Sequence, residues 1–157
     1  MGRSLAIQRV CLALSVAGLA VAGYLAVAHY TSPSLLVCSD RGMVDCAQVT
    51  SSPQSAIAGV PVAVLGVLFF MAMALLTLPP AWRSQSTAIK AARVGLVWVG
   101  ICLVLWLIYA ELFLVHAICL YCSLVHVITF ALFVLILFNN GESKLATTSA
   151  DASLRHA

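Results

Sequence analysis

The chain has 157 residues, and its composition excludes an ordinary soluble domain. Hydrophobic residues make up 63% of it, charged residues only 8%, and the mean hydropathy is +1.09. A soluble domain carries roughly 25% charged residues, so this chain has too few charges to cover a water-exposed surface. The composition also excludes a disordered chain and a nucleic-acid-binding protein with a basic face.

Four apolar runs are long enough to cross a bilayer as helices. In chain order they cover residues 10–28, 57–78, 94–110 and 117–138, and they contain no Asp, Glu, Lys or Arg. A helical span needs about 20 apolar residues, and helix is the default because lipid offers no hydrogen-bond partner to the backbone. No run alternates as a barrel strand would. The sequence therefore predicts an all-α, four-helix membrane bundle.

This bundle makes up one domain, residues 1–138, with an outer loop at about residues 29–56. Residues 139–157 are polar and are expected to fray as a flexible tail. The first apolar run also resembles a signal peptide, because Arg3 and Arg9 precede it and small residues end it. However, it is longer than the roughly 7–15 apolar residues of a signal peptide.

The placement of the basic residues predicts the orientation, although the net charge is only +3. Lys and Arg are enriched on the cytoplasmic side of membrane proteins. Only Arg41 falls on the opposite side, in the loop between the first two spans. We therefore expect both termini to be cytoplasmic, on the side that carries the other seven basic residues: Arg3, Arg9, Arg83, Lys90, Arg93, Lys144 and Arg155.

Four of the six cysteines lie on the outer side. Cys38 and Cys46 are in the outer loop with seven residues between them, and Cys119 and Cys122 form a C-x-x-C motif at the start of the fourth run. Disulfides persist on this side of a membrane, so two pairs indicate disulfide chemistry. The plainer interpretations are one structural disulfide in the loop and a chance C-x-x-C in a membrane helix.

Two further interpretations concern packing and metal. Cys11 and Cys102 lie within spans, where cysteine commonly serves as a small apolar residue. The outer cysteines could also bind zinc, but 72 residues separate Cys46 from Cys119, and the bilayer edge does not suit a closed structural site. We therefore predict no metal site.

The spacing of the C-x-x-C motif suits electron transfer to a lipid-soluble acceptor. On one helix, Cys119 and Cys122 are about 60° apart around the axis and about 4.5 Å apart along it. Cys119 is expected in the first turn, where free N–H groups and the helix dipole favour the thiolate, the attacking species in disulfide exchange. One sulfur can then face the aqueous loop and the other an apolar cavity. The lipid-soluble two-electron acceptor of a bilayer is a quinone.

His126 extends the same helix face, four residues after Cys122. An ionisable residue inside a span is a functional hypothesis by default. The imidazole could donate a hydrogen bond to a quinone carbonyl as negative charge develops there. The alternative is a packed histidine bonded to a neighbouring helix.

Over about residues 8–138, these motifs resemble the vitamin K epoxide reductase family. Besides the two cysteine pairs, the matching pieces are Gly59-Val-Pro61 at the start of the second helix and Tyr109-Ala-Glu111 near the end of the third. The other four-helix family of quinone-linked disulfide oxidases, from bacterial periplasms, carries its C-x-x-C in the first loop instead. The resemblance implies a four-helix bundle with a quinone pocket near the outer surface.

The resemblance also implies roles for the cysteines. Cys38 and Cys46 would be a shuttle pair that trades electrons with a soluble partner. Cys119 would exchange with Cys46, and Cys122 would meet the quinone. Ser52 matches a serine that stabilises this loop region in the family.

Three more residues are expected at the quinone site. His126 stands where vertebrate members carry a Tyr that bonds the substrate ketone, and Val62 stands where some members carry an Asn. Both departures argue against vitamin K epoxide itself as the substrate. Tyr109 is the third expected quinone contact, and the segment at 55–59 resembles the short amphipathic segment that caps the pocket.

The sequence therefore predicts a quinone-dependent thiol–disulfide oxidoreductase of the bacterial cytoplasmic membrane, with its site facing the periplasm. Bacterial members of the family oxidise periplasmic thioredoxin-fold proteins and pass the electrons to a membrane quinone. The quinone would be of the menaquinone, ubiquinone or vitamin K type. The chain has no thioredoxin-like domain, so the partner is expected to be a separate protein. We expect contacts with lipid and none with nucleic acid.

Two alternatives belong to other classes. One is a quinone or vitamin K epoxide reductase of an endoplasmic reticulum membrane, supplied with electrons by lumenal thioredoxin-like proteins. The other is a four-span adaptor or transporter with a structural disulfide in its outer loop. A transporter is expected to carry intramembrane charges or broken, repeated helices, and a structural disulfide does not explain the second cysteine pair.

Overall fold

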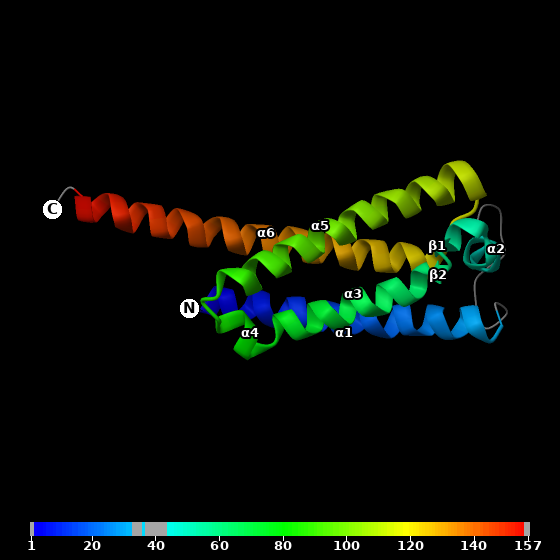
Figure 1. Cartoon of the computed structure of the whole chain (residues 1–157), viewed down its shortest axis with the longest axis horizontal. Helices are drawn as coiled ribbons and strands as arrows, with labels where there is room; N and C mark the ends of the chain where they lie inside the picture. Colours follow the sequence, from blue (N-terminus) through cyan, green and yellow to red (C-terminus); the bar gives the residue numbers. More distant parts are fainter. Residues whose placement is uncertain (1, 33–35, 37–43, 156–157) are drawn as a thin grey trace.

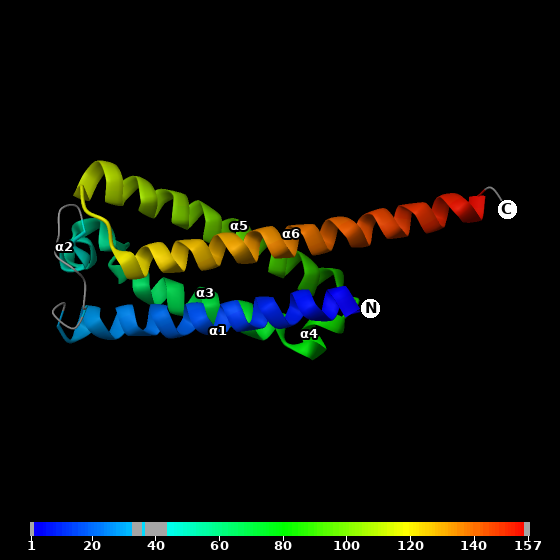
Figure 2. The same cartoon turned by 180° about the vertical axis from the view of Figure 1, so that it is seen from behind.

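The computed structural model describes residues 2–32, 36 and 44–155, with the surroundings of side chains at 4–32, 36 and 44–140. Within these residues, four long helices run along the length of the molecule (Figure 1). The N-terminus and the C-terminal end lie at the same end of the bundle in both views (Figures 1 and 2). The four helices are α1 (Gly2–Tyr30), α3 (Val62–Thr77), α5 (Thr87–Tyr109) and α6 (Leu120–Arg155).

The predicted helical membrane architecture is confirmed, with one helix shorter than expected. Among the described residues, three segments are long and apolar enough to cross a bilayer: Ser4–Tyr30, Thr87–Val115 and Leu120–Asn140. Helix α3 has 16 residues, slightly fewer than the roughly 17 that a short span needs. It nevertheless lies beside α1 along the bundle (Figure 1).

Helix α3 is short because the start of the predicted span at 57–78 forms a hairpin instead. Its strands, β1 (Ala56–Ile57) and β2 (Val60–Pro61), pair antiparallel. Ala58 and Gly59 between them have φ values of 52° and 80°, as a tight two-residue hairpin turn requires. The helix ends at Thr77 because prolines follow at 79 and 80, and proline disfavours helix in the residue before it.

The third helical segment is longer than the predicted 94–110. Helix α5 begins at Thr87 and continues into a π-helical turn, η3 (Ala110–Val115), which extends beyond the end of the predicted run. The expectation that the spans carry no charge is therefore wrong. Arg93 and Glu111 both lie in this segment, and they are only 3% and 6% exposed.

Arg93 is buried because it serves the end of α3 and the short helix α4 (Pro79–Arg83). Its Nη2 donates hydrogen bonds to the carbonyls of Leu76 at 2.8 Å and Ala81 at 3.2 Å. These carbonyls lie at helix ends, where they lack partners within the helix. The guanidinium also lies 4.3 Å from the centre of the Trp82 ring. The arginine thus fixes the turn that joins α3 to α5.

Glycines allow the helices to approach closely. Helix α1 packs most extensively on α3, and a Cβ atom at Gly18 would overlap the fully buried ring of Phe70. A Cβ at Gly100 of α5 would come within 2.7 Å of the Phe69 ring. Small residues at such contacts are typical of helix packing in membranes.

Helix α6 differs from the prediction at both ends. It begins at Leu120, so Cys119 lies one residue before the first turn rather than within it. The polar tail at 139–157, expected to fray, is helical as far as Arg155. Residues 142–155 contain no proline or glycine, the two residues that most oppose a helix. Figure 1 shows this part of α6 projecting beyond the other helices.

Candidate active site

Cys119 occupies the N-cap position of α6. Its Sγ accepts a hydrogen bond from the backbone N–H of Cys122 at 3.3 Å, and its carbonyl accepts the N–H of Ser123 at 2.9 Å. A hydrogen bond from the Cys122 side chain lowers the pKa of the Cys119 thiol below its ordinary value, although burial opposes this shift. The first cysteine of the motif is therefore prepared to react as a thiolate.

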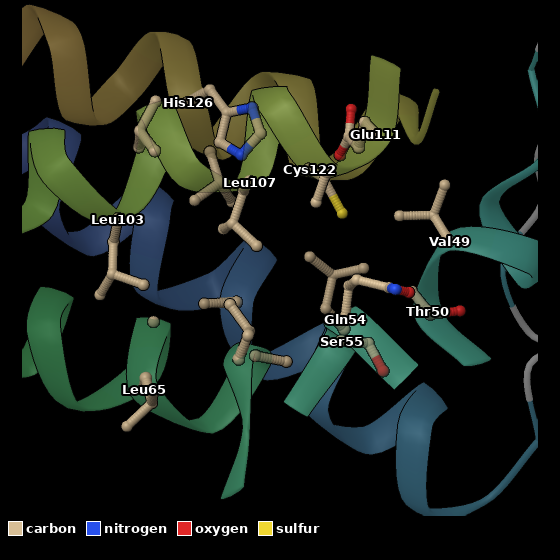
Figure 3. A pocket seen from close by; sticks show the side chains of 18 of the residues that line it. Val49, Thr50, Gln54, Ser55, Leu65, Leu103, Leu107, Glu111, Cys122 and His126 are labelled. Carbon is tan, nitrogen blue, oxygen red and sulfur yellow. The ribbon is translucent and has the colours of Figure 1, made fainter. Parts of the chain in front are cut away.

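The two sulfurs of the motif lie in different surroundings. Cys119 is fully buried in a cluster that also contains Cys46, Leu25 and Ala117. Cys122 is partly buried and lines a cavity between the helices. Figure 3 shows the Cys122 sulfur pointing into that space. One sulfur thus faces the segment that carries Cys46, and the other faces the cavity.

Cys46 begins the short helix α2 (Cys46–Ser51), which lies across the end of the bundle (Figure 1). Asp45 caps this helix, with its carboxylate accepting the N–H of Gln48 at 2.8 Å. The preceding backbone pairs with the segment before Cys119: Val44 forms a parallel bridge with Ile118, and the Asp45 N–H donates to the Ile118 carbonyl at 3.2 Å. These contacts hold the start of α2 against the start of α6.

Cys46 is disulfide-bonded, whereas Cys119 and Cys122 are free thiols, as are Cys11 and Cys102. Cys38, the predicted partner of Cys46, lies outside the described residues, as does Arg41.

The cavity has a volume of about 130 Å³ and a mostly apolar lining. An apolar cavity of about 150 Å³ can bind benzene, so the space is suited to one aromatic ring. All four long helices line it, and α2 and the 3₁₀ turn η2 (Pro53–Ser55) cover one end (Figure 3). Its polar lining residues are His29, Thr50, Ser52, Gln54, Ser55, Glu111, Cys122, His126 and Thr129.

Two ionisable side chains flank Cys122 in this cavity. His126, only 7% exposed, reaches it from α6, and Glu111 reaches it from η3 (Figure 3). Among the described residues, none forms a hydrogen bond with the His126 ring. The alternative of a histidine bonded to a neighbouring helix is therefore not what the structure has. The ring is available to a bound molecule.

Of the three other predicted site residues, two line the cavity and one does not. Val62 and Ser52 line the cavity, and the Ser52 Oγ donates to the Val49 carbonyl at 2.8 Å. Tyr109 does not line the cavity, which corrects the prediction that it contacts the quinone. This residue is 47% exposed, and its ring stacks on Phe113 with 5.2 Å between ring centres. Tyr109 therefore lies on the outer face of α5, away from the cavity.

Three residues that line the cavity were not predicted as site residues: Glu111, Gln54 and His29. The His29 Nδ1 donates to the Thr50 carbonyl at 3.2 Å and so ties the end of α1 to α2. Glu111 left a signal in the sequence, since it is the only acidic residue between Asp45 and Glu142. Gln54 and His29 lie in the expected outer loop, and no pattern distinguishes them there.

A helical membrane bundle with a C-x-x-C at a helix start beside a ring-sized apolar cavity is the arrangement of a membrane-embedded redox protein. The family model of the vitamin K epoxide reductase family (VKOR) matches residues 9–137. The chain therefore belongs to this family, as its motifs predicted, and it is a multi-pass membrane protein and an oxidoreductase. A comparison with curated proteins found no match.

Proposed function

We propose that the protein is a quinone-dependent thiol–disulfide oxidase. Electrons run from a separate thioredoxin-fold dithiol protein to the Cys38–Cys46 pair, then to Cys119 and Cys122, and finally to a membrane quinone. The two thiols of each donor pair lose two electrons and two protons, and the quinone gains both to become a hydroquinone. The site faces the exterior of a bacterial cytoplasmic membrane.

One observation carries this proposal. Cys119 shares a buried cluster with the disulfide-bonded Cys46, whereas Cys122 lines a ring-sized apolar cavity. The first arrangement supports exchange between the pairs, and the second supports contact with a quinone ring. An oxidised Cys46 beside free Cys119 and Cys122 corresponds to the stage after internal exchange and before quinone reduction.

The direction of electron flow follows from reduction potentials. Strongly oxidising thioredoxin-fold proteins have potentials near about −120 mV, so their oxidant must be more oxidising still. A membrane quinone meets that requirement, whereas a glutathione pool does not. The buried Arg93 and Glu111 remove one argument against a transporter, but free Cys119 and Cys122 beside the disulfide-bonded Cys46 have no role in that alternative.

The test is quinone reduction by the purified protein, followed by absorbance, with a reduced thioredoxin-fold donor. Cys119→Ala and Cys122→Ala should abolish turnover with every donor. Cys38→Ala and Cys46→Ala should abolish turnover with the protein donor but keep most of it with a small membrane-permeant dithiol, which can reach the Cys119–Cys122 pair through the cavity that Cys122 lines.

Cys11→Ala and Cys102→Ala are the matched controls, because both thiols are free and neither lines the cavity. Both variants should keep most of the wild-type activity. Absence of quinone reduction by the wild type would refute the proposal. Equal failure of both donors with Cys46→Ala would show that the loop pair maintains the cavity instead of shuttling electrons.

A further inference from the structure

Glu111 is a buried carboxyl that the electron path above does not use. It lies in η3, is only 6% exposed and lines the cavity together with Cys122 and His126. In Figure 3 its side chain lies beside that of Cys122 at the same end of the space. Burying a charge is costly unless it is paired, so a carboxyl in this position needs an explanation.

The backbone holds Glu111 against the start of α6. Its carbonyl accepts the N–H of Ala117 at 3.2 Å and also that of His116, which has a left-handed φ of 57°. The Cys119 backbone also lies beside the Glu111 carboxyl. π-Helical turns are frequent at functional sites, and this one places the carboxyl beside the C-x-x-C motif.

No cation neutralises this carboxyl among the described residues. The ionisable side chains that face the cavity are His29 from α1, and Cys122 and His126 from α6. Cys119 adjoins them just before α6, while α2, η2 and α3 contribute no ionisable side chain to the lining. His29 is engaged by the Thr50 carbonyl. Glu111 therefore shares its end of the cavity with the thiol of Cys122.

The two thiols differ in how they lose their protons when the disulfide between them forms. The Cys119 thiol has a lowered pKa because Cys122 donates a hydrogen bond to its sulfur. The Cys122 thiol therefore keeps its proton longer than the Cys119 thiol does. This proton has to be removed inside the apolar cavity. A base has to lie within reach of that sulfur.

We propose that Glu111 is the catalytic base that removes the Cys122 proton and passes it to the reduced quinone. This inference rests on the proposed function. As the Cys119–Cys122 bond forms, the sulfurs lose two electrons to the quinone. One proton moves from Cys122 through Glu111 to a quinone oxygen. The quinone takes its second proton from solvent, which has already received the proton of Cys119. Glu111 ends the cycle in its starting state.

The test is single-turnover quinone reduction by pre-reduced protein across a pH series, with a quinone titration at each pH. Glu111→Gln should reduce the rate at neutral pH about 10²-fold, in the range of general base catalysis, with little change in KM. Without the base, only the Cys122 thiolate reacts, so the variant's rate should rise with pH about tenfold per unit. The wild-type rate should rise less steeply. Glu111→Asp should keep a substantial part of the activity.

Glu142→Gln is the matched control, since it makes the same change in the part of α6 that projects away from the cavity. A Glu111→Gln variant with the same rate and pH profile as Glu142→Gln would overturn the inference and leave the proposed function intact. So would a loss that is equal at every pH. A wild type that reduces no quinone would overturn both. If Glu111→Gln melts early, Glu111→Asp decides: slower reduction at an unchanged melting temperature supports the inference, and the wild-type rate at every pH overturns it.

Discussion

His126 reaches the cavity from α6 and has no hydrogen-bond partner among the described residues. The quinone oxygen becomes negative during reduction, and a donor in a dry cavity stabilises that charge more than one in water. In the proposed reaction the imidazole would therefore polarise the bound carbonyl, while Glu111 would take the proton of the thiol.

We predict that His126→Phe slows quinone reduction by roughly 10- to 100-fold, because loss of one such donor typically costs about 10²–10³ in rate and water can replace part of it. Disulfide exchange between Cys46 and the soluble partner should be unchanged, and His126→Tyr should recover much of the loss. Stopped-flow measurement of both half-reactions tests this. Quinone turnover by His126→Phe at the wild-type rate would make the residue a packing histidine.

Individual residues were predictable to different degrees. Cys122 and His126 both line the cavity, as helical periodicity predicts for residues four apart, whereas Cys38 lies outside the described residues. The same rule explains why Tyr109 was wrong. It lies two residues from Glu111, about 200° around a helix, so the two side chains face opposite sides. Burial of Glu111 places Tyr109 outside, and the sequence did not reveal which of the two is inside.

At the scale of secondary structure, the contact between α1 and α3 depends on Gly18. The Phe70 ring fills the space that a Cβ would need, and neither residue leaves room for adjustment. Gly23, in the same helix, has no atom within 4 Å of such a Cβ. Substitution by alanine is therefore expected to have opposite effects on stability at Gly18 and at Gly23.

We predict that Gly18→Ala destabilises the bundle by about 1–3 kcal/mol, the usual cost of overpacking a core. Gly23→Ala should be neutral or stabilising by up to about 1 kcal/mol, since alanine is the better helix former. Melting temperatures in detergent, followed by circular dichroism, compare the two. An equal effect of both substitutions would show that the contact between the helices is not tight at Gly18.

The sequence predicts which segments form helices more accurately than it predicts where those helices begin and end. Apolar runs identify membrane helices, but the hairpin at 56–61 and the extension of α5 to Val115 depend on local backbone conformation. Pro61 and Gly59 were visible signals of the first change. The π-helical turn has no sequence signature of that kind, and it is what brings Glu111 into the cavity.

At the scale of the whole molecule, both termini lie at one end of the bundle, and α2 and the start of α6 lie at the other (Figures 1 and 2). The turn with Arg83 and Lys90 lies at the same end as the termini. Basic residues accumulate on the cytoplasmic side, so this end is expected to face the cytoplasm.

We predict that a cysteine introduced at Ser86, which is exposed at the start of α5, reacts with a membrane-impermeant thiol reagent only from the cytoplasmic side. In reduced protein, Cys38 or Cys46 should react from the outer side. Labelling of intact cells and of inverted vesicles, read by mass spectrometry, distinguishes the two faces. The reverse pattern would place the cavity at the cytoplasmic surface.

The pairing of Val44 with Ile118 has a kinetic consequence. Reactions between groups held on one scaffold behave as if one group were present at very high concentration, up to about 10⁵–10⁸ M in well-oriented cases. Because this pairing anchors α2 beside the start of α6, the proposed transfer between Cys46 and Cys119 would be a unimolecular step. Its rate should be independent of how far the protein is diluted in the bilayer, so that only encounters with the soluble donor and with the quinone respond to supply.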